Sequence, residues 1–578
     1  MSDKDASTPG EISPWTFSLL YPMEIAANPH EVSNELDQDT QHNLGIDRII
    51  AGFTNHKERQ NEIRKTLCLL IQDPDTIRYR QDVLEDFLSF PDLVERLEIL
   101  FPALDTLVQY ASRNEQHTDS LQGVIWRLGE LQNVLDCLQG LGDIFDSVKG
   151  ELRSQGLLIL QGEVRKVIDH PTFQHLVKEL PELLTKIRAC VSITIGVNLD
   201  ASLRPVQAVL LSVNDERFTD QSLINRLFGL QGEQAGIAPL HSVPQRAVDG
   251  HFAFPIASEL GWAVEPMMVP LFSDLSKVLK KTTAPVAKRL QQYSQVQGRM
   301  FITLRRDLLF YLGAVRFVRA LIQHGLSVCR PEIAPATDRL CEVQDSYNAN
   351  LALILMSTRS DLPAAIITNN IYMGPDGRIL ILTGPNQGGK TTYLQGAGVV
   401  QLLAQVGCFV PGSRALISPV DQIFTHFPIE EKPETEKGRF GEESMRLGKI
   451  FERVTRYSLV LLNESLSSTS LGESLYLAQD VVRILRRVGV RAIYSTHMYE
   501  LAQRAGELSE SVPGNSLIIS VVSSPLDIDS QASPEEVKRT YKVEIRPPLG
   551  QSYAREIAAR YGIGYEQLEK ALTDRGVL

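Results

Sequence analysis

A glycine-rich run between a short apolar stretch and a helix-forming stretch constrains this chain more than any other sequence feature. Residues 378–395 read RILILTGPNQGGKTTYLQ. Residues 379–382 predict a buried strand, and residues 384–391 then fit the pattern GxxxxGK[ST] ahead of a helix. Glycines let backbone N–H groups turn inward around phosphate oxygens, and the helix N-terminus adds partial positive charge. The run therefore predicts a P-loop that binds ATP.

Two side chains of this loop have predicted roles. The ammonium of Lys390 is expected to reach the β- and γ-phosphates, and the hydroxyl of Thr391 is expected to ligate Mg²⁺. The predicted cofactors are therefore ATP and Mg²⁺. The predicted nucleotide-binding residues are Gly384, Pro385, Asn386, Gln387, Gly388, Gly389, Lys390, Thr391 and Thr392.

Two later apolar runs, at 458–462 and 492–494, read as strands that end in polar residues. The first is followed by Asn463 and Glu464, the second by Ser495, Thr496 and His497. In P-loop ATPases an acid at the first position holds the Mg²⁺ shell, and a following Glu orients the attacking water. Asn463 is an uncharged amide, which leaves slow hydrolysis and no hydrolysis both open. We predict Glu464, His497 and Asn463 as catalytic residues, with Asn463 also reaching the metal through water.

Apolar periodicity divides the chain of 578 residues into three predicted parts. Residues 1–45 lack sustained periodicity and are expected to form a loosely docked N-terminal arm. Residues 46–346 predict a mainly α-helical domain, in which Asp73-Pro74 marks a helix start. Within it lies a β-rich insertion at about 190–265, where 191–197 and 206–213 read as strand–turn–strand. Residues 347–578 alternate short apolar runs with helices and predict a parallel α/β sheet.

Composition narrows the functional classes. The net charge of -12 argues against a protein that coats nucleic acid over its whole surface, but allows a local basic groove. Lysines and arginines between 277 and 319 fit either a solvated helix face or a groove for phosphates. Six cysteines without a CxxC pair suggest reduced thiols. No apolar run approaches the roughly 18 residues of a membrane helix, and the acidic N-terminus is no secretory signal. We therefore expect a cytoplasmic protein without a membrane partner.

Taken together, these motifs resemble the ATPase domain of the MutS family. The run TGPNQGGKTTYLQ looks like its Walker A segment, residues 457–464 look like its Walker B strand, and 495–497 look like its switch histidine. Residues 69–87 are similar to the start of its helical core domain. Further likeness lies in Val410-Pro411 and in residues 421–425, 541–543 and 550–557.

This resemblance implies a multidomain fold. A mainly α-helical core/lever with a small clamp-like β-rich insertion would precede an α/β P-loop (ABC-type) ATPase domain. It also implies a homodimer through the ATPase domains, in which a loop of the partner completes each site in trans. The matching loop residues are Gly438, Phe440 and Glu443, with Gly438 in place of a serine expected to touch the γ-phosphate. We expect no counterpart of the mismatch-reading domain with its Phe-x-Glu wedge, of the connector domain, or of a Smr domain.

The favoured hypothesis is an ATP-driven MutS-like clamp with weak DNA-dependent ATP hydrolysis. It would bind duplex or branched DNA without sequence specificity and act in DNA repair or recombination. The candidate phosphate contacts are Lys280, Lys281, Lys288 and Arg289. The alternative is a nucleotide-dependent scaffold with little hydrolysis and a protein partner. A small-molecule P-loop kinase fits poorly, because such kinases do not need a long helical region before the P-loop.

Overall fold

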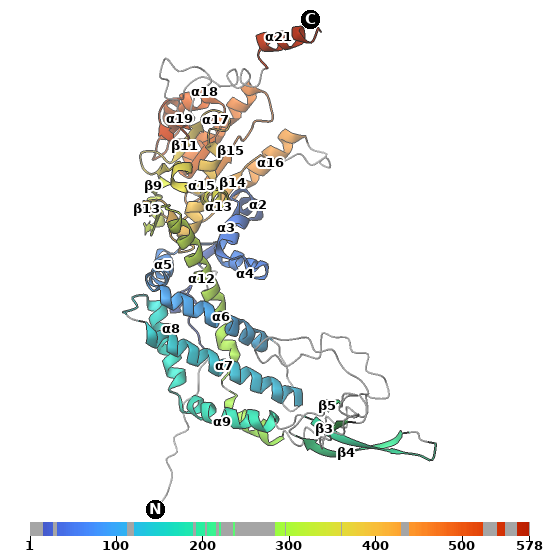
Figure 1. The fold of residues 1–578 in the computed structure, drawn as a ribbon. Coiled ribbons are helices and arrows are strands. Elements are labelled where there is room, and N and C mark those ends of the chain that lie inside the picture. Colours follow the sequence, from blue (N-terminus) through green and yellow to red (C-terminus); the bar gives the residue numbers. More distant parts are fainter. Residues whose placement is uncertain are drawn as a thin grey trace, which may run out of the picture. The chain divides into compact units, whose positions relative to one another are not determined.

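The computed structural model describes residues 15–26, 32–112, 121–148, 150–188, 192–202, 205–214, 219–220, 235–236, 284–294, 296–359, 361–428, 438–523, 540–548 and 563–576. Contacts divide the chain into two compact units. One comprises residues 1–15, 99–146 and 162–302, and the other residues 16–98, 147–161 and 303–578. Figure 1 gives the order of the elements along the chain. The domain boundaries at 46 and 347 are not tested by this division and stay a prediction.

In its described part, the first unit is mainly helical, as the apolar stripes predict. It contains nearly all of α7 (Leu121–Ser147) and the whole of α9 (Pro171–Arg188), η2 (Gln291–Tyr293) and η3 (Gly298–Met300). It also contains the later parts of α6 (Pro91–Ser112) and α8 (Gln155–Ile168). Arg127 of α7 donates to the carbonyl oxygens of Tyr293 and Val296 at 2.5 and 2.8 Å. Glu130, which pairs with Arg127, also accepts from the backbone N–H of Gly298 at 2.8 Å. These bonds fix the short turns around 291–300 against α7.

A β-hairpin also belongs to the first unit. The antiparallel strands β3 (Ser192–Leu199) and β4 (Pro205–Asn214) confirm the predicted strand–turn–strand. The rest of the predicted insertion lies outside the described residues, apart from β5 (Thr219–Asp220), β6 (Ala235–Gly236) and parts of the turn between β3 and β4.

Before its larger sheets, the second unit contains several short elements and the longer helices α5 and α12. They are α1 (Met23–Ala26), β1 (Ser33–Glu35), α2 (Gln38–Asn43), α3 (Ile46–Phe53), α4 (Lys57–Leu67), β2 (Leu69–Ile71), α5 (Pro74–Ser89) and most of α12 (Phe301–Gln323). The predicted start of α5 is confirmed, because the carboxylate of Asp73 accepts from the backbone N–H of Thr76 at 2.8 Å. Pro74, which has no N–H to satisfy, then occupies the first turn.

The expectation of a loosely docked arm is wrong for the described residues 16–26 and 32–45. Leu19 and Leu44 are fully buried. The buried carboxylate of Asp307 on α12 accepts from the Ser18 hydroxyl at 2.6 Å and from the Leu19 backbone N–H at 2.9 Å. Thr40 on α2 donates to the carbonyl of Ile423 at 3.3 Å. The segment is fixed by partners about 290 to 380 residues away in sequence, which local periodicity does not register.

Helices were expected to continue to residue 346, and this is wrong after about 326. Residues 328–346 contain β7 (Val328–Cys329), β8 (Glu332–Ile333), η4 (Ala336–Asp338) and β9 (Cys341–Ser346). Pro331 and Pro335 interrupt any helix there. A sheet of order β10-β9-β13-β8 results, with β10 (Asn369–Met373) and β13 (Arg414–Ile417), while β12 (Val410–Pro411) pairs with β7.

A six-stranded sheet positions the predicted site. Its order is β14-β15-β16-β11-β17-β18, parallel except for the antiparallel edge strand β18. The strands are β14 (Ile423–His426), β15 (Leu459–Asn463), β16 (Arg491–Ser495), β11 (Ile379–Thr383), β17 (Ile518–Ser523) and β18 (Val543–Ile545). The predicted parallel α/β sheet is confirmed. The carboxyl ends of β11, β16 and β15 lie next to one another, at one edge of the sheet.

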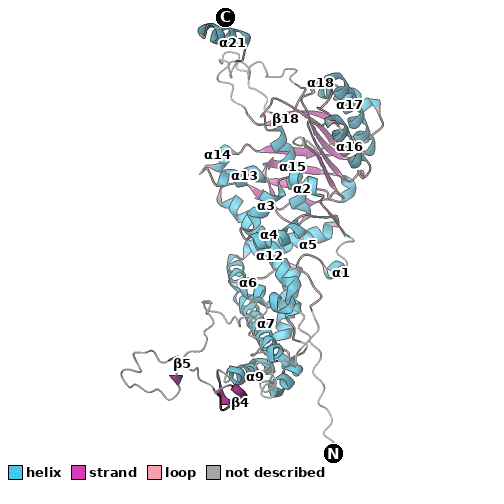
Figure 2. Cartoon of the chain, turned by 90° about the vertical axis from the view of Figure 1, so that its right-hand side faces the viewer, coloured by secondary structure: helices cyan, strands magenta, loops and turns pink. Residues whose placement is uncertain are grey.

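Helices pack on the two faces of this sheet (Figure 2). One face carries a core from β11, β15 and β16 with α16 (Arg439–Phe451), α17 (Leu471–Val488), α18 (Tyr499–Gln503) and α19 (Ala505–Ser511). α15 (Lys390–Gln405) packs against β15 and β16. The described residues of this unit also form α13 (Ala349–Met356), α14 (Leu362–Ala365) and α21 (Tyr565–Asp574). Within the described part of the chain, no helix has both the length and the apolar character needed to span a bilayer.

Candidate nucleotide site

The predicted P-loop connects the central strand β11 to α15. Gly384 and Gly389 have φ angles of 144° and 90°, which side-chain-bearing residues rarely adopt. A Cβ atom at Gly384 would lie 2.5 Å from the carbonyl oxygen of Ser523. The Ser523 hydroxyl in turn donates to the carbonyl of Gly388 at 2.9 Å. The loop is therefore held against β17, and Gly389 opens the N-terminus of α15 toward the predicted phosphate position.

Lys390 is buried inside this loop. Its ammonium donates to the carbonyl oxygens of Gly384 and Pro385 at 3.1 and 3.2 Å. It also lies 3.7 Å from Oε1 of Glu464. Burial lowers the pKa of Lys390, and the Glu464 carboxylate opposes that shift. The cation is thus held by loop carbonyls and one carboxylate, next to the place where phosphates are expected.

The three predicted catalytic residues meet at the carboxyl ends of β15 and β16. His497 Nε2 lies 3.0 Å from Oε1 of Glu464, within hydrogen-bond distance. Asn463 Oδ1 accepts from the Thr391 hydroxyl at 3.4 Å. Glu464 has a φ of 52°, in the left-handed region. The structure therefore brings Lys390, Thr391 and the three predicted residues together.

A cavity of about 760 Å³ adjoins the loop, and sequence motifs predict only part of its lining. The P-loop and Glu464 line one part, while Asn348, Ile367 and Tyr541 line others. The ring of Tyr541 comes within 3.5 Å of the position a Cβ would take at Gly389. Asn369 fixes that region, because its side-chain amide donates to the Tyr541 carbonyl at 3.1 Å. These residues belong to no phosphate-binding motif, so sequence reasoning missed them.

Gly438, Phe440 and Glu443 were expected in a loop, but residues 439–451 form helix α16 and Gly438 is its N-cap. Gly438 and Phe440 are exposed. Glu443 instead contacts its own chain, where it accepts from the backbone N–H of Leu466 at 2.6 Å and pairs with the Ser468 hydroxyl. Of the three residues predicted to reach a partner's site, two are therefore exposed, whereas Glu443 is bonded within its own chain.

Comparison with known proteins agrees with this geometry. Residues 380–572 match the sequence model of MutS domain V, and residues 72–324 match that of the MutS2 N-terminal domain. The two matches together cover most of the chain. This chain belongs to the MutS family. The match to MutS domain V implies ATP binding by the P-loop.

Individual relatives of the family have modest identity. A DNA mismatch repair protein MutS of Fervidobacterium nodosum is 33% identical over 206 residues, which are 36% of this chain and 24% of the relative. One of Geobacillus kaustophilus is 24% identical over 51% of this chain and 32% of the relative. One of Synechococcus elongatus is 23% identical over 88% of this chain and 58% of the relative. The chain thus spans less than two thirds of the length of each of these MutS proteins.

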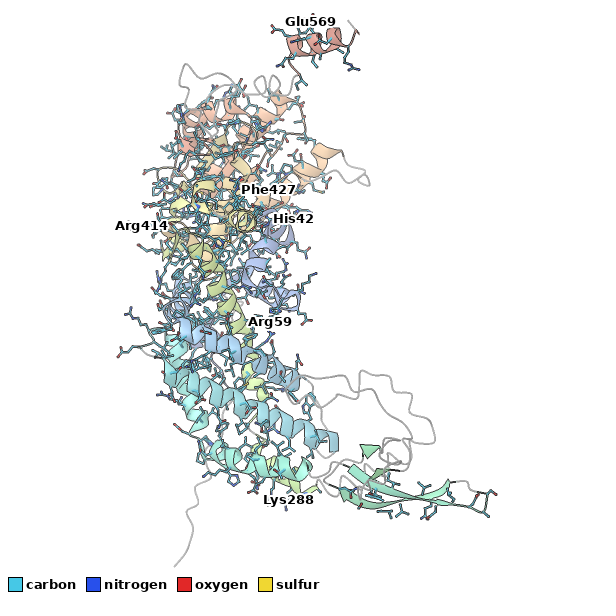
Figure 3. All side chains as sticks on the ribbon, viewed as in Figure 1. His42, Arg59, Lys288, Arg414, Phe427 and Glu569 are labelled. Atoms are coloured by element: carbon cyan, nitrogen blue, oxygen red, sulfur yellow. The ribbon has the colours of Figure 1, made fainter. Side chains whose placement is uncertain are left out.

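The residues expected to contact DNA are only partly described. Lys280 and Lys281 lie outside the described residues, as does the family-like segment 550–557. Lys288, which is labelled in Figure 3, and Arg289 are exposed on a helical segment at 284–290. Arg289 pairs with Glu179 at 2.9 Å. Lys288 is therefore the better candidate of these two for a phosphate contact.

One buried histidine next to the site has no counterpart in the sequence prediction. His426, at the end of β14, is 2% exposed, and its Nδ1 lies 2.7 Å from the hydroxyl of Ser465, the residue after Glu464. Burial, aided by repulsion from Arg446, lowers the pKa of His426 to about 4. The imidazole is therefore neutral at neutral pH.

This shift predicts a loss of stability in acid. Between about pH 6.5 and pH 4 the unfolded state binds a proton at His426 that the folded state does not, so stability falls as pH falls. The free energy of unfolding should be about 2 kcal/mol lower at pH 5 than at pH 7 because of this residue. In His426→Asn, which retains a polar partner for Ser465, that part of the pH dependence should disappear. Urea unfolding followed by circular dichroism at both pH values measures it, and equal pH dependence in both proteins would contradict it.

Proposed function

We propose that this chain is an ATP-driven DNA clamp of the MutS family, which acts in DNA repair or recombination. One observation carries the proposal: the ends of three neighbouring strands bring five residues together in and around one P-loop. They are Lys390, Thr391, Asn463, Glu464 and His497. The names of the relatives, which are DNA mismatch repair proteins, supply the connection to DNA.

In the proposed reaction, Lys390 exchanges its bonds to the loop carbonyls for bonds to the β- and γ-phosphates. The ammonium of Lys390 thereby moves away from the Glu464 carboxylate. That carboxylate is then able to orient the attacking water and accept its proton. His497 Nε2, 3.0 Å from that carboxylate, holds Glu464 in place. Its predicted second role is to contact the γ-phosphate.

The donor set also fits Mg²⁺. Thr391 and Asn463 place a hydroxyl and an amide oxygen 3.4 Å apart, which suits an ion that keeps several waters and takes its charge partners from the phosphates. When bound, Mg²⁺ would neutralise developing phosphate charge. Because neither oxygen is charged, these two side chains would bind Mg²⁺ only weakly in the absence of nucleotide.

The proposed clamp pairs two ATPase domains. Gly438 and Phe440, at the start of α16, are exposed and therefore available to the γ-phosphate side of a partner's site. The exposed start of this helix supports the proposed homodimer. Sedimentation with ATP and with ADP tests it, and a monomer in both at micromolar concentration would rule out shared sites.

DNA binding should depend steeply on salt and little on mispairing. Lysines and arginines contact phosphates, which carry no sequence information, so matched and mispaired duplexes should bind alike and a four-way junction at least as well. Affinity should fall by about 0.9 log units per log unit of salt for each phosphate contact. Lys288→Ala should reduce that slope by about one contact, while Lys57→Ala, an exposed lysine on α4, serves as control. Gel-shift titrations measure this, and tenfold tighter binding of a mispair would contradict the proposal.

A second candidate, a nucleotide-dependent scaffold with a protein partner, is favoured by one observation. The last position of β15, where P-loop ATPases usually carry an acid, is occupied by Asn463. Phosphate release over multiple turnovers separates the two candidates. Turnover that DNA accelerates supports the clamp, whereas ATP binding with neither turnover nor DNA binding supports the scaffold.

A further inference from the structure

The loop that carries Glu464 is held in an unfavourable backbone conformation. Glu464 and Leu466 have φ angles of 52° and 66°, although both carry side chains. Such conformations persist only where the surrounding structure fixes them. The contacts that fix this loop therefore also fix the direction of the Glu464 carboxylate.

Residues of two neighbouring strands, β14 and β16, contact Ser465 and the backbone of Glu464. Ser465 is contacted by His426 of β14, and its carbonyl accepts from the Tyr494 hydroxyl of β16 at 2.7 Å. The backbone N–H of Glu464 itself donates to the carbonyl of Ser495, the last residue of β16, at 2.9 Å. These contacts hold the first part of the loop to its neighbouring strands.

The second part of the loop is held by one carboxylate of α16. Oε1 of Glu443 accepts from the backbone N–H of Leu466 at 2.6 Å, and its Oε2 accepts from the Ser468 hydroxyl. A charged acceptor strengthens both bonds relative to neutral ones. One side chain thus connects two points of the loop, two residues apart, to the helix.

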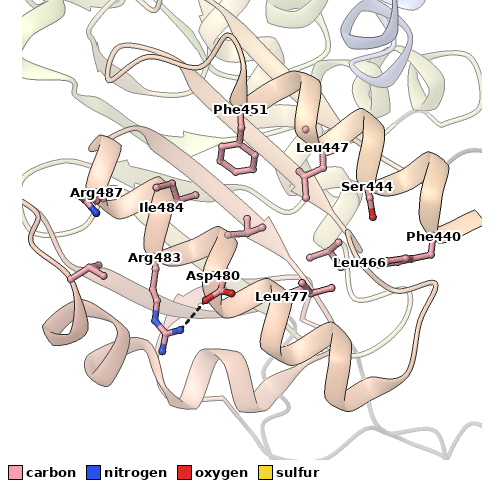
Figure 4. Close-up of a pocket in the computed structure, with 13 residues that line it drawn as sticks. Phe440, Ser444, Leu447, Phe451, Leu466, Leu477, Asp480, Arg483, Ile484 and Arg487 are labelled. Atoms are coloured by element: carbon pink, nitrogen blue, oxygen red, sulfur yellow. Dashed lines mark hydrogen bonds and ion pairs between the residues drawn. The ribbon is translucent and has the colours of Figure 1, made fainter.

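The side chain of Leu466 is held by the same helix. It is 3% exposed and lines an apolar cavity of about 600 Å³ between α16 and α17, together with Phe440 and Leu447 of α16 (Figure 4). Leu466 is therefore fixed to α16 both through its backbone N–H and through its side chain. A shift of α16 cannot leave this loop unchanged.

We infer that Glu443 is a positioning residue that acts within its own chain by holding the Glu464 loop in its catalytic conformation. The inference rests on the proposed role of Glu464 in hydrolysis. It differs from the expectation that Glu443 completes the partner's site, because both carboxylate oxygens of Glu443 are engaged by its own chain. Gly438 and Phe440, one turn earlier, stay exposed. Partner contact at the start of α16 would thereby reach the Glu464 loop through Glu443.

Amide hydrogen exchange tests the contact itself. In nucleotide-free Glu443→Ala, peptides spanning 464–468 should exchange faster than in wild type, because the N–H of Leu466 loses its acceptor. Glu443→Gln, which retains one acceptor oxygen, should be intermediate. Glu442→Ala removes the neighbouring acid of the same helix and should exchange as wild type does. Ser468→Ala is the mildest change and removes only the hydroxyl that donates to Glu443. It should also raise exchange, and it replaces Glu443→Ala as the test if that variant does not fold. Unchanged exchange in these variants of Glu443 and Ser468 overturns the inference.

Kinetics then test the positioning role. Glu443→Ala should lower ATP turnover on the order of tenfold to a hundredfold, the size expected for a misplaced catalytic group, and leave ATP affinity within about threefold. Loss of affinity equal to the loss of turnover would overturn the inference. If wild type itself does not hydrolyse ATP, the proposed hydrolysis fails, and the exchange measurement still decides the role of Glu443.

Mixed subunits separate action in the same chain from action on the partner. Equal amounts of Glu443→Ala and Lys390→Ala protein are combined, and ATP turnover is measured. If Glu443 acts in its own chain, the mixture stays at the low turnover of Glu443→Ala, because every intact P-loop belongs to a chain with a misplaced Glu464. If Glu443 acts on the partner, one site in each mixed dimer is complete, and recovered turnover would overturn the inference.

Discussion

Replacing Lys390 with alanine should weaken ATP binding by about two orders of magnitude, the usual cost of removing one partner of a buried, hydrogen-bonded charge pair. The wild-type ammonium is 6% exposed and donates to two loop carbonyls. Its removal also leaves the Glu464 carboxylate without this cation, so that it repels incoming phosphates. Calorimetry with a non-hydrolysable ATP analogue and Mg²⁺ measures the loss.

Two controls accompany this variant. Lys449→Ala removes an exposed lysine of α16 in the same unit and should leave affinity unchanged. Lys390→Arg keeps the charge but not the compact ammonium, so it should restore only part of the affinity. A melting temperature close to that of wild type would show that the alanine variant is folded. Unchanged affinity in folded Lys390→Ala would mean that nucleotide does not bind at this loop.

The P-loop region could be predicted closely because its signals are local. The strand was predicted at residues 379–382, and β11 extends one residue further, Ile379–Thr383. A continuous apolar run, glycines with positive φ and a helix follow one another without interruption. Parallel strands place their carboxyl ends at one edge, so Asn463, Glu464 and His497 were expected near the loop once β15 and β16 were recognised.

What the sequence did not disclose depends on contacts between distant segments. Residues 16–21 carry a short apolar run without helical spacing, and distant partners such as Asp307 and Tyr311 explain why it is buried. Glu443 was assigned by resemblance to a partner's site, because its contacts to Leu466 and Ser468 cross from one helix to a loop that no spacing rule connects. The low pKa of His426 likewise comes from burial, which sequence type alone does not give.

Glu464→Gln should lower ATP turnover by at least about a hundredfold, because a positioned carboxylate contributes roughly 10²- to 10⁴-fold as a general base. The amide retains the size of the side chain but neither accepts the water proton nor keeps the charge that faces His497 and Lys390. Lys390 loses its carboxylate partner at the same time and is left to its bonds with neutral carbonyls. Affinity for ATP should therefore be equal to that of wild type or greater.

Pre-steady-state phosphate release and binding of a non-hydrolysable analogue measure the two quantities separately. Glu507→Gln, which alters an exposed carboxylate on α19, is the matched control and should behave as wild type. Equal turnover in Glu464→Gln and wild type would remove Glu464 from the reaction. If both proteins bind ATP and neither releases phosphate, Asn463→Asp decides the cause. A charged oxygen 3.4 Å from the Thr391 hydroxyl would attract Mg²⁺ more strongly, so turnover gained by that variant alone would trace the inactivity to the neutral metal position.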